Sequence, residues 1–281
     1  MNSRNLVNLL LLVTLIAFAS FYIHKKNQSV EIKRLTTLDI SEITNIKIPR
    51  EDGTEILFEK TAISNGQSEW QMRRPYQMKA HQFRINSLLG LTQTPVDKIY
   101  NASTLELSQY ALDKPRAQIY FNDTLISFGK SSPVNNKRYL MTGSQLTLLE
   151  DQIYPLVSAQ PTTFIDLNLL NTGHDIIAIK TPDIYLTKND SGLWVTQPEM
   201  QLNADEIHSL LEDWKNLQAF AVHRYMKRKQ LGEIIITTKD QQIIFEISDD
   251  DPWLILARPD LGIEYHIDNT LKKKLLGPAD A

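Results

Sequence analysis

The chain has 281 residues, a formal net charge of −3 and a pI of about 6.1, and 42% of its residues are hydrophobic. This balance suffices for ordinary hydrophobic cores, and it disfavours a nucleic-acid-binding protein because such domains are strongly basic. Cysteine is absent, which excludes disulfides, thiolate catalysis and cysteine metal ligands, and which is compatible with an oxidising compartment.

The N-terminal region, residues 1–26, contains an apolar run from Leu6 to Ile23 that predicts a transmembrane helix. About 18 residues at about 1.5 Å each span about 27 Å, which is enough to cross the hydrocarbon core of a bilayer. A cleaved signal peptide is the alternative, with Ala17-Phe18-Ala19 as its cleavage site. The apolar run continues beyond that site, which favours an uncleaved anchor.

The charges on either side of the run leave its orientation open. Lys25 and Lys26 follow the run and only Arg4 precedes it, so the positive-inside rule would place the bulk of the chain in the cytoplasm. A short tail before an uncleaved apolar segment also fits an anchor that doubles as an export signal, with the bulk outside. Residues 27–42 are interpreted as a polar stalk.

Residues 43–160 show the pattern of a first α+β repeat. Asp52-Gly53 lies between two runs of alternating apolar residues, which is the strongest short-range signal for a β-hairpin. A helix predicted from Ala80 to Leu91 offers Phe83, Leu88 and Leu89 to a core. Further strands are expected over 70–72, 118–121, 125–128, 139–141 and 146–149, followed by a short helix over 150–157.

Residues 161–281 repeat this order. Asn203 and Glu206 have the spacing of a capping box at the start of a second main helix. Apolar residues then recur on one face of that helix, at Ile207, Leu210, Leu211, Trp214 and Leu217. Strands are expected over 176–179, 185–187, 194–196, 234–236, 243–247, 253–257 and 264–267, followed by a helix over 268–276.

Two matched blocks indicate that one unit occurs twice. Glu69-Trp70-Gln71-Met72 corresponds to Leu193-Trp194-Val195-Thr196, with an offset of 194 − 70 = 124 positions that the following residues keep. We therefore predict an α+β protein with an N-terminal transmembrane helix followed by two tandem repeats, each an antiparallel sheet with one main helix. The two tryptophans are expected in the cores, and a ligand-stacking role is the alternative.

The sequence predicts no catalytic, cofactor-binding or metal-binding residue and no enzymatic activity. It contains no glycine-rich phosphate loop, no nucleophile elbow and no histidine pair with metal-ligand spacing. His174-Asp175 together with Asp166 would form an acid/base dyad only if the fold brought them together. Asp249-Asp250-Asp251 is interpreted as an acidic hairpin tip, because the surrounding residues lack the calcium-loop pattern.

A dense basic run from His223 to Lys229 is the candidate interaction surface. Its candidate contact residues are Arg224, Lys227, Arg228 and Lys229, near the end of the second main helix. Contact with anionic lipid headgroups or with an acidic partner is the functional hypothesis. The alternative is an exposed helix end or loop whose charges are simply solvated.

These features resemble the bacterial family called domain of unknown function 4340. The resemblance rests on the apolar N-terminal run, the repeated tryptophan block and the segment from Tyr110 to Pro115, which reads Tyr-Ala-Leu-Asp-Lys-Pro. The family motif usually reads Tyr-Gly-Leu-Asp-x-Pro, so Ala111 replaces a glycine here. Gly129-Lys130 and Phe164-Ile165-Asp166 resemble further family segments. The second repeat lacks a clear copy of the Leu-Asp-x-Pro motif.

The resemblance implies a single-pass protein of the bacterial inner membrane with the bulk of the chain in the periplasm. Members are often encoded beside ABC-type export components and gliding-motility-type auxiliary proteins. We therefore expect a binding or scaffolding protein of the cell envelope, accessory to an ABC-type transport complex, with a protein partner, no cofactor and no nucleic acid. The alternative is an envelope hydrolase or a periplasmic ligand-binding protein that uses the cleft between the repeats.

Overall fold

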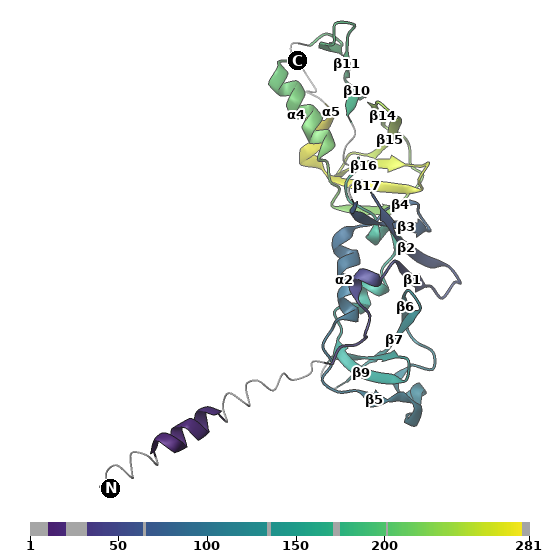
Figure 1. Cartoon of the computed structure of the whole chain (residues 1–281). Helices are drawn as coiled ribbons and strands as arrows, with labels where there is room; N and C mark the ends of the chain where they lie inside the picture. The colour runs from purple at the N-terminus through teal and green to yellow at the C-terminus, as the bar shows by residue number, and fades with distance from the viewer. Residues whose placement is uncertain are drawn as a thin grey trace.

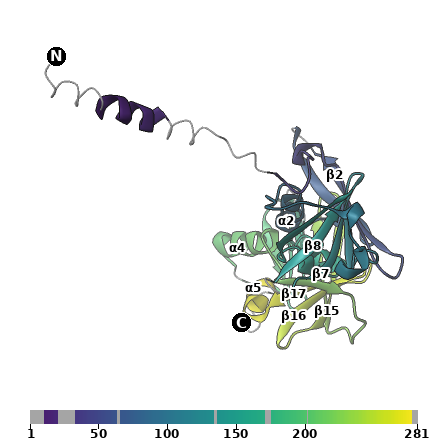
Figure 2. The ribbon, with the colours of Figure 1, turned by 90° about the horizontal axis from the view of Figure 1, so that it is seen from below.

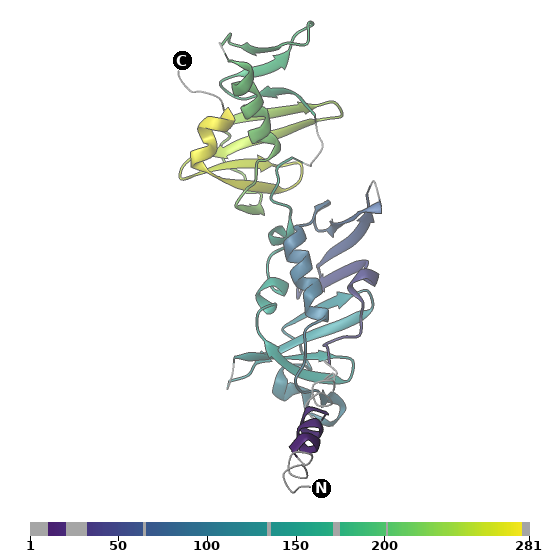
Figure 3. The ribbon, with the colours of Figure 1, turned by 60° about the vertical axis from the view of Figure 1, so that its left-hand side comes forward.

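The structure, a computed structural model, describes residues 11–20, 33–63, 66–133, 136–170, 175–200 and 202–276. Residues 11–20 are helical, and from residue 33 onward the chain forms two α+β units that lie end to end (Figures 1 and 3). The predicted α+β class is confirmed, because each unit is built on an antiparallel sheet and helices are few.

The first unit contains a nine-stranded antiparallel sheet. Its strands are β1 (Asn45–Pro49), β2 (Glu55–Ala62), β3 (Ser68–Arg74), β4 (Met78–Lys79), β5 (Tyr100–Asn101), β6 (Ala117–Phe121), β7 (Thr124–Ser131), β8 (Lys137–Thr142) and β9 (Gln145–Glu150). The order across the sheet is β4-β3-β2-β1-β6-β7-β8-β9-β5. The predicted Asp52-Gly53 turn connects β1 to β2, with Gly53 at a φ of 81° that glycine adopts without steric cost.

The second unit contains an eight-stranded antiparallel sheet. Its strands are β10 (Ile176–Lys180), β11 (Tyr185–Lys188), β12 (Trp194–Gln197), β13 (Ala221–Arg224), β14 (Gly232–Thr238), β15 (Gln242–Asp249), β16 (Trp253–Arg258) and β17 (Ile263–Asp268). The order across this sheet is β12-β11-β10-β14-β15-β16-β17-β13.

One main helix accompanies each sheet, and both lie on the same side of the molecule (Figures 1 and 2). These helices are α2 (Gln82–Thr92) and α4 (Ala204–Lys215), and Asn203 and Glu206 form the predicted capping box at the start of α4. The shorter helical segments are η1 (Ile40–Glu42), η3 (Ala102–Thr104), η4 (Leu107–Tyr110), α3 (Tyr154–Val157), η5 (Pro161–Phe164), η6 (Asn269–Leu271) and α5 (Lys272–Leu276).

The two sheets have the same strand order when each is followed from the strand that carries the matched tryptophan. The first reads β3-β2-β1-β6-β7-β8-β9-β5 and the second reads β12-β11-β10-β14-β15-β16-β17-β13, while β4 has no counterpart. Trp70 in β3 lies opposite Lys60 of β2, and Trp194 in β12 lies opposite Lys188 of β11. The 124-residue offset therefore joins equivalent strands, although only Trp70 is fully buried and Trp194 remains partly exposed.

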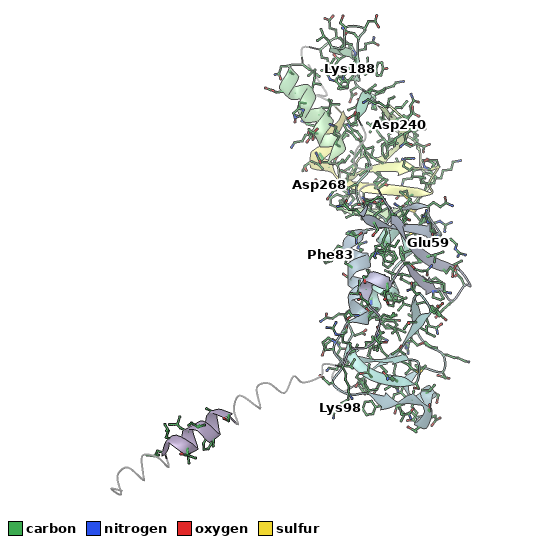
Figure 4. All side chains as sticks on the ribbon, in the orientation of Figure 1. Glu59, Phe83, Lys98, Lys188, Asp240 and Asp268 are labelled. Carbon is green, nitrogen blue, oxygen red and sulfur yellow. The ribbon has the colours of Figure 1, made fainter. Side chains whose placement is uncertain are left out.

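The helix α2 buries the leucines expected from its sequence but not Phe83. Leu88 and Leu89 are buried as predicted, together with Ile85, but the ring of Phe83 is 74% exposed on the outer side of the helix (Figure 4). Phe83 precedes Leu88 by five residues, which corresponds to a rotation of about 140° around the helix axis. The prediction that Phe83 joins the core is therefore wrong.

The residues that connect the two units are packed rather than flexible. Phe164 and Ile165 are fully buried, and the Phe164 ring lies 5.2 Å from that of Phe58 in an edge-to-face arrangement. The His81 amide donates to the Phe164 carbonyl at 2.7 Å, and the Ala219 amide donates to the Leu167 carbonyl at 2.9 Å. The same short segment is therefore hydrogen-bonded to both units.

The described part of the predicted stalk, residues 33–42, is packed against the first unit. Leu35 is buried, and its amide donates to the Thr94 carbonyl just beyond α2. The Val96 amide donates to the Lys33 carbonyl at 2.9 Å, so the chain enters the first unit beside the segment that leads into β5. Residues 27–32 lie outside the described residues.

Each sheet is crossed by a segment that we call a strap. The first strap, residues 102–116, connects β5 to β6 and therefore passes over β9, β8 and β7. Leu112 of this strap is buried against Gly129, where an added Cβ would lie 2.3 Å from the Tyr110 carbonyl oxygen. Tyr110 packs edge-to-face on Tyr139 of β8 at 4.9 Å. The family-like Tyr110 to Pro115 segment is thus a structural strap, and Gly129 is the residue that permits its close approach.

Replacing Ala111 with glycine is expected to stabilise the protein by about 1 kcal/mol. Ala111 has a φ of 53° and a ψ of 45° at the end of η4, a left-handed conformation that costs an L-residue roughly 1–2 kcal/mol. Glycine adopts this conformation freely. It also raises the conformational entropy of the unfolded chain, which offsets part of the stabilisation. Thermal melting of Ala111→Gly provides the measurement, with Ala117→Gly in strand β6 as the control. A melting midpoint of Ala111→Gly below that of the wild type would contradict the expectation.

Candidate functional site

The basic run lies on an edge strand and on the second strap. Arg224 ends β13, and the second strap, residues 225–231, connects β13 to β14 and so crosses β17, β16 and β15. Residues 216–222 separate the run from the end of α4 at Lys215. His223 and Arg224 lie in the strand that pairs with β17, and the rest of the run has no regular secondary structure, as in the predicted loop alternative.

A buried ion pair attaches the second strap to the sheet. Glu264 of β17 has no exposed surface, and it lies on the face opposite the main core because its neighbours Ile263 and Tyr265 point into that core. The Arg228 guanidinium donates to both of its carboxylate oxygens, at 2.7 and 3.1 Å. The Met226 amide donates to the same carboxylate at 3.1 Å. Arg228 is thus an internal anchor, with 24% of its side chain exposed.

The pH dependence of stability should report this ion pair. Burial raises the pKa of Glu264, but hydrogen bonds from Arg228, His266 and the Met226 amide outweigh that effect, and the net pKa is lowered. A lowered folded-state pKa means that the ionised Glu264 stabilises the fold above its unfolded pKa of about 4.3, and that this contribution is lost as the pH falls through the folded-state pKa. Glu264→Gln should therefore melt below the wild type at pH 7.

The difference between the two proteins should shrink as the pH falls below about 4, because the wild-type carboxyl then also becomes neutral. Thermal melting of both proteins between pH 7 and pH 3 provides the measurement. A difference that stays constant over this range would show that Glu264 does not stabilise the fold through its charge.

The other three basic side chains of the run are exposed. Arg224, Lys227 and Lys229 make no ion pair or side-chain hydrogen bond with any described residue, in contrast to Arg228 between them. Two exposed apolar side chains of the strap, Met226 and Leu231, accompany them. The strap and the adjoining end of β13 therefore present three cations and apolar surface on a backbone that is fixed to the sheet.

A group of aromatic and histidine rings lies beside the strap on the edge of the second sheet. The rings of His223 and His266 have centroids 4.5 Å apart, and Phe220 packs edge-to-face on Trp253 at 5.0 Å. His266 Nε2 lies 3.0 Å from the Glu264 carboxylate. Burial and the neighbouring His266 lower the pKa of His223. Sequence reasoning missed this group because its members come from three separate segments, residues 220–223, β16 and β17.

A family model described as domain of unknown function (DUF4340) matches residues 70–235. The chain belongs to this family. The resemblance drawn from the tryptophan block and the Tyr110 to Pro115 segment is thereby confirmed. The DUF4340 match begins in β3 and ends in β14, so it includes both straps and the connection between the units. No curated protein and no solved structure matches the chain.

A cleft of about 610 Å³ lies between the two units of this DUF4340 protein. The Lys79 ammonium in its wall lies 3.2 Å from the Glu69 carboxylate and 3.9 Å from that of Asp166. On the opposite wall, Arg258 forms a two-point ion pair with Asp260, at 2.9 and 2.7 Å. Burial raises the pKa of the nearby Tyr265 phenol to about 12, so this phenol stays protonated at neutral pH. The cleft is polar, with charged groups that already pair with one another.

The other candidate groups from the sequence do not converge. Asp249 accepts hydrogen bonds from the amides of Asp250 and Asp251, and Asp250 pairs with Lys272 at 2.5 Å. Among the described residues, no cluster of three histidine or acidic side chains has an arrangement suited to a metal ion. His174 of the predicted dyad lies outside the described residues, and Asp175 pairs with Lys239 at 2.6 Å.

Only part of the predicted membrane span falls within the described residues. The helix of residues 11–20 lies inside the run from Leu6 to Ile23. Residues 6–10 and 21–23 of this run lie outside the residues that the structure describes. In the described part of the chain, no helix has both the length and the apolar character needed to cross a bilayer.

Proposed function

We propose that this DUF4340 protein is a membrane-anchored, extracytoplasmic binding and scaffolding protein of the bacterial cell envelope, accessory to an ABC-type transport complex. The apolar run from Leu6 to Ile23 supports the anchor, and the family resemblance supports the envelope location. One structural observation carries the scaffolding role. The segment from Phe164 to Leu169 is hydrogen-bonded to both units, so the two units form one elongated body.

A fixed body of this kind suits a scaffold for a physical reason. Partner proteins that bind different units are held at a constant separation, and little conformational entropy is lost when both bind. A hinged pair of domains would lose this advantage, because relative motion is the default for units joined by a flexible linker. The proposal assigns no catalytic residue, no cofactor and no metal to the chain.

Fusions to the C-terminus of the full-length chain test the location. Alkaline phosphatase fused there should be active and a cytoplasmic fluorescent reporter should be dark, and the full-length protein should remain in washed membranes. The opposite reporter pattern would place the bulk of the chain in the cytoplasm. Purification from native membranes should recover subunits of a transport complex, and their absence would contradict the scaffolding role.

A second candidate function is binding of a small polar ligand in the cleft between the units. The supporting observation is the volume of about 610 Å³ together with charged side chains from both units, Lys79 and Arg258 among them. A mass-spectrometric search for a ligand that copurifies with the wild type and not with Arg258→Ala tests this function. A matched variant of an exposed cation outside the cleft, Lys130→Ala, should recover the ligand as the wild type does, and an equal loss from Lys130→Ala and Arg258→Ala would argue against specific binding in the cleft.

A further inference from the structure

From the second strap and the adjoining Arg224 of β13 we infer a docking surface for an acidic, partly apolar segment of a partner protein. This inference rests on the proposed scaffolding function and names the class of partner that one surface would bind. Its first support is charge. Arg224, Lys227 and Lys229 are exposed cations with no ion-pair partner among the described residues. Opposite charges on a partner steer its approach and fix its register on the surface.

The second support is that the strap is already held in place before any partner binds. The Tyr225 amide donates to the Gly262 carbonyl at 2.9 Å, and the Leu231 amide donates to the Ile247 carbonyl at 2.8 Å. Between these two ends, Arg228 is fixed by its pairing with Glu264. A fixed backbone reduces the ordering cost of binding, so the exposed cations act from defined positions.

The third support is apolar surface among the cations. Met226 is 56% exposed and Leu231 is 52% exposed, both within the strap. Phe220 and Trp253 are also exposed and pack on each other, and the Phe220 ring lies 6.2 Å from that of His266, which contacts Glu264. Aromatic residues and arginine are enriched where interfaces concentrate their binding energy. A partner segment that alternates acidic and apolar residues would satisfy both kinds of contact, whereas a purely acidic segment would leave the apolar side chains uncovered.

Sheet order favours a protein partner over an anionic membrane. The chain enters the first unit near Lys33, beside the segment that leads to the edge strand β5. The second unit joins at the opposite edge, where the Asp166 amide donates to the Lys79 carbonyl of β4. Nine strands at about 4.8 Å separate these two edges by roughly 38 Å. The strap lies beyond that opposite edge, in the unit farther from the point at which an anchor preceding residue 33 would join the folded chain (Figure 1).

The test uses the full-length chain in nanodiscs of neutral phosphatidylcholine and a labelled peptide of alternating glutamate and leucine. The variant carries Arg224→Glu, Lys227→Glu and Lys229→Glu, and it keeps Arg228 so that Glu264 retains its partner. A control variant carries Lys98→Glu, Lys114→Glu and Lys130→Glu, three exposed cations of the first unit, which gives the same change in net charge. Lys98 marks the far end of that unit in Figure 4.

We expect the strap variant to bind the peptide at least tenfold more weakly than the wild type and the control variant to bind within twofold of it. Equal loss in both variants, or no loss in either, would overturn the inference. Phosphatidylglycerol vesicles that displace the peptide from the wild type would reassign the strap to lipid and also overturn it. The strap variant should melt within a few degrees of the wild type, which excludes unfolding as the cause of weaker binding.

Failure of the inference can be told apart from failure of the proposed function. If wild type and strap variant recover the same transport subunits from native membranes, and the peptide result is negative, the scaffold stands and the strap is not its contact. If neither protein recovers any subunit, the scaffolding role is contradicted. The peptide measurement then still tests whether the strap binds an acidic, partly apolar segment.

Discussion

Arg228→Ala is expected to lower the free energy of unfolding by about 3 kcal/mol, because removing one partner of a buried ion pair leaves the other charge uncompensated. Glu264 has no exposed surface, and two of its four hydrogen bonds come from Arg228. The strap that covers Glu264 would also lose its central attachment to the sheet. Urea unfolding of the variant and the wild type at pH 7 gives the difference.

The matched control is Lys229→Ala, in the next residue of the same strap. Lys229 is exposed and makes no ion pair with a described residue, so its replacement should change stability by less than about 0.5 kcal/mol. Adding Glu264→Gln to Arg228→Ala should recover part of the loss, because a neutral amide is cheaper to bury than a carboxylate. An Arg228→Ala variant as stable as Lys229→Ala would mean that the ion pair does not hold the strap.

Local sequence signals were sufficient for elements that are determined by neighbouring residues. The Asp52-Gly53 hairpin formed where predicted because a glycine with positive φ suits the turn. The capping box of Asn203 and Glu206 starts α4 because both groups lie within one helical turn. These contacts are short in sequence, so no knowledge of the rest of the fold is needed to predict them.

The strap and its ion pair could not be predicted in this way. Residues 225–231 carry charge without helical or strand periodicity, and their path follows only from the position of β13 beyond β17. Glu264 alternates with the apolar Ile263 and Tyr265, a pattern that predicts a solvent-facing carboxylate. It is buried because a segment more than 30 positions earlier in the chain crosses over it. The sequence therefore groups Arg228 with its exposed neighbours, although Arg228 is paired with Glu264 and the others are not.

The repeated tryptophans show a related limit. The 124-residue offset places Trp70 and Trp194 in equivalent strands, yet equivalence of position did not ensure equal burial. Trp194 is partly exposed, with the Lys188 ammonium 5.1 Å from its ring centroid. The fully buried tryptophan of the second unit is Trp214 of α4, which the helical periodicity had already placed on the apolar face. For the tryptophans of the second unit, the helical periodicity of α4 therefore predicted burial correctly, whereas the position in the repeat did not.

Trp214→Ala is expected to lower the free energy of unfolding by about 3–5 kcal/mol, the range for removing a large buried aromatic side chain. Trp214 has no exposed surface, and its ring lies 6.1 Å from that of Phe245. Its indole Nε1–H also donates to the Leu275 carbonyl at 3.1 Å, which attaches α5 to α4. The variant would leave both a cavity and a buried carbonyl without its donor.

Trp194→Ala should cost clearly less, about 1 kcal/mol, because a partly exposed ring loses less contact with the core and its site can fill with water. At roughly 2–4 °C per kcal/mol for a protein of this size, the melting midpoint should fall by about 6–20 °C for Trp214→Ala and by only a few degrees for Trp194→Ala. Thermal melting of both variants beside Trp214→Phe, which keeps most of the volume but loses the donor, separates the cavity from the hydrogen bond. Equal losses of unfolding free energy for Trp194→Ala and Trp214→Ala would contradict the expectation, because they would show that the burial of each ring does not determine its contribution to stability.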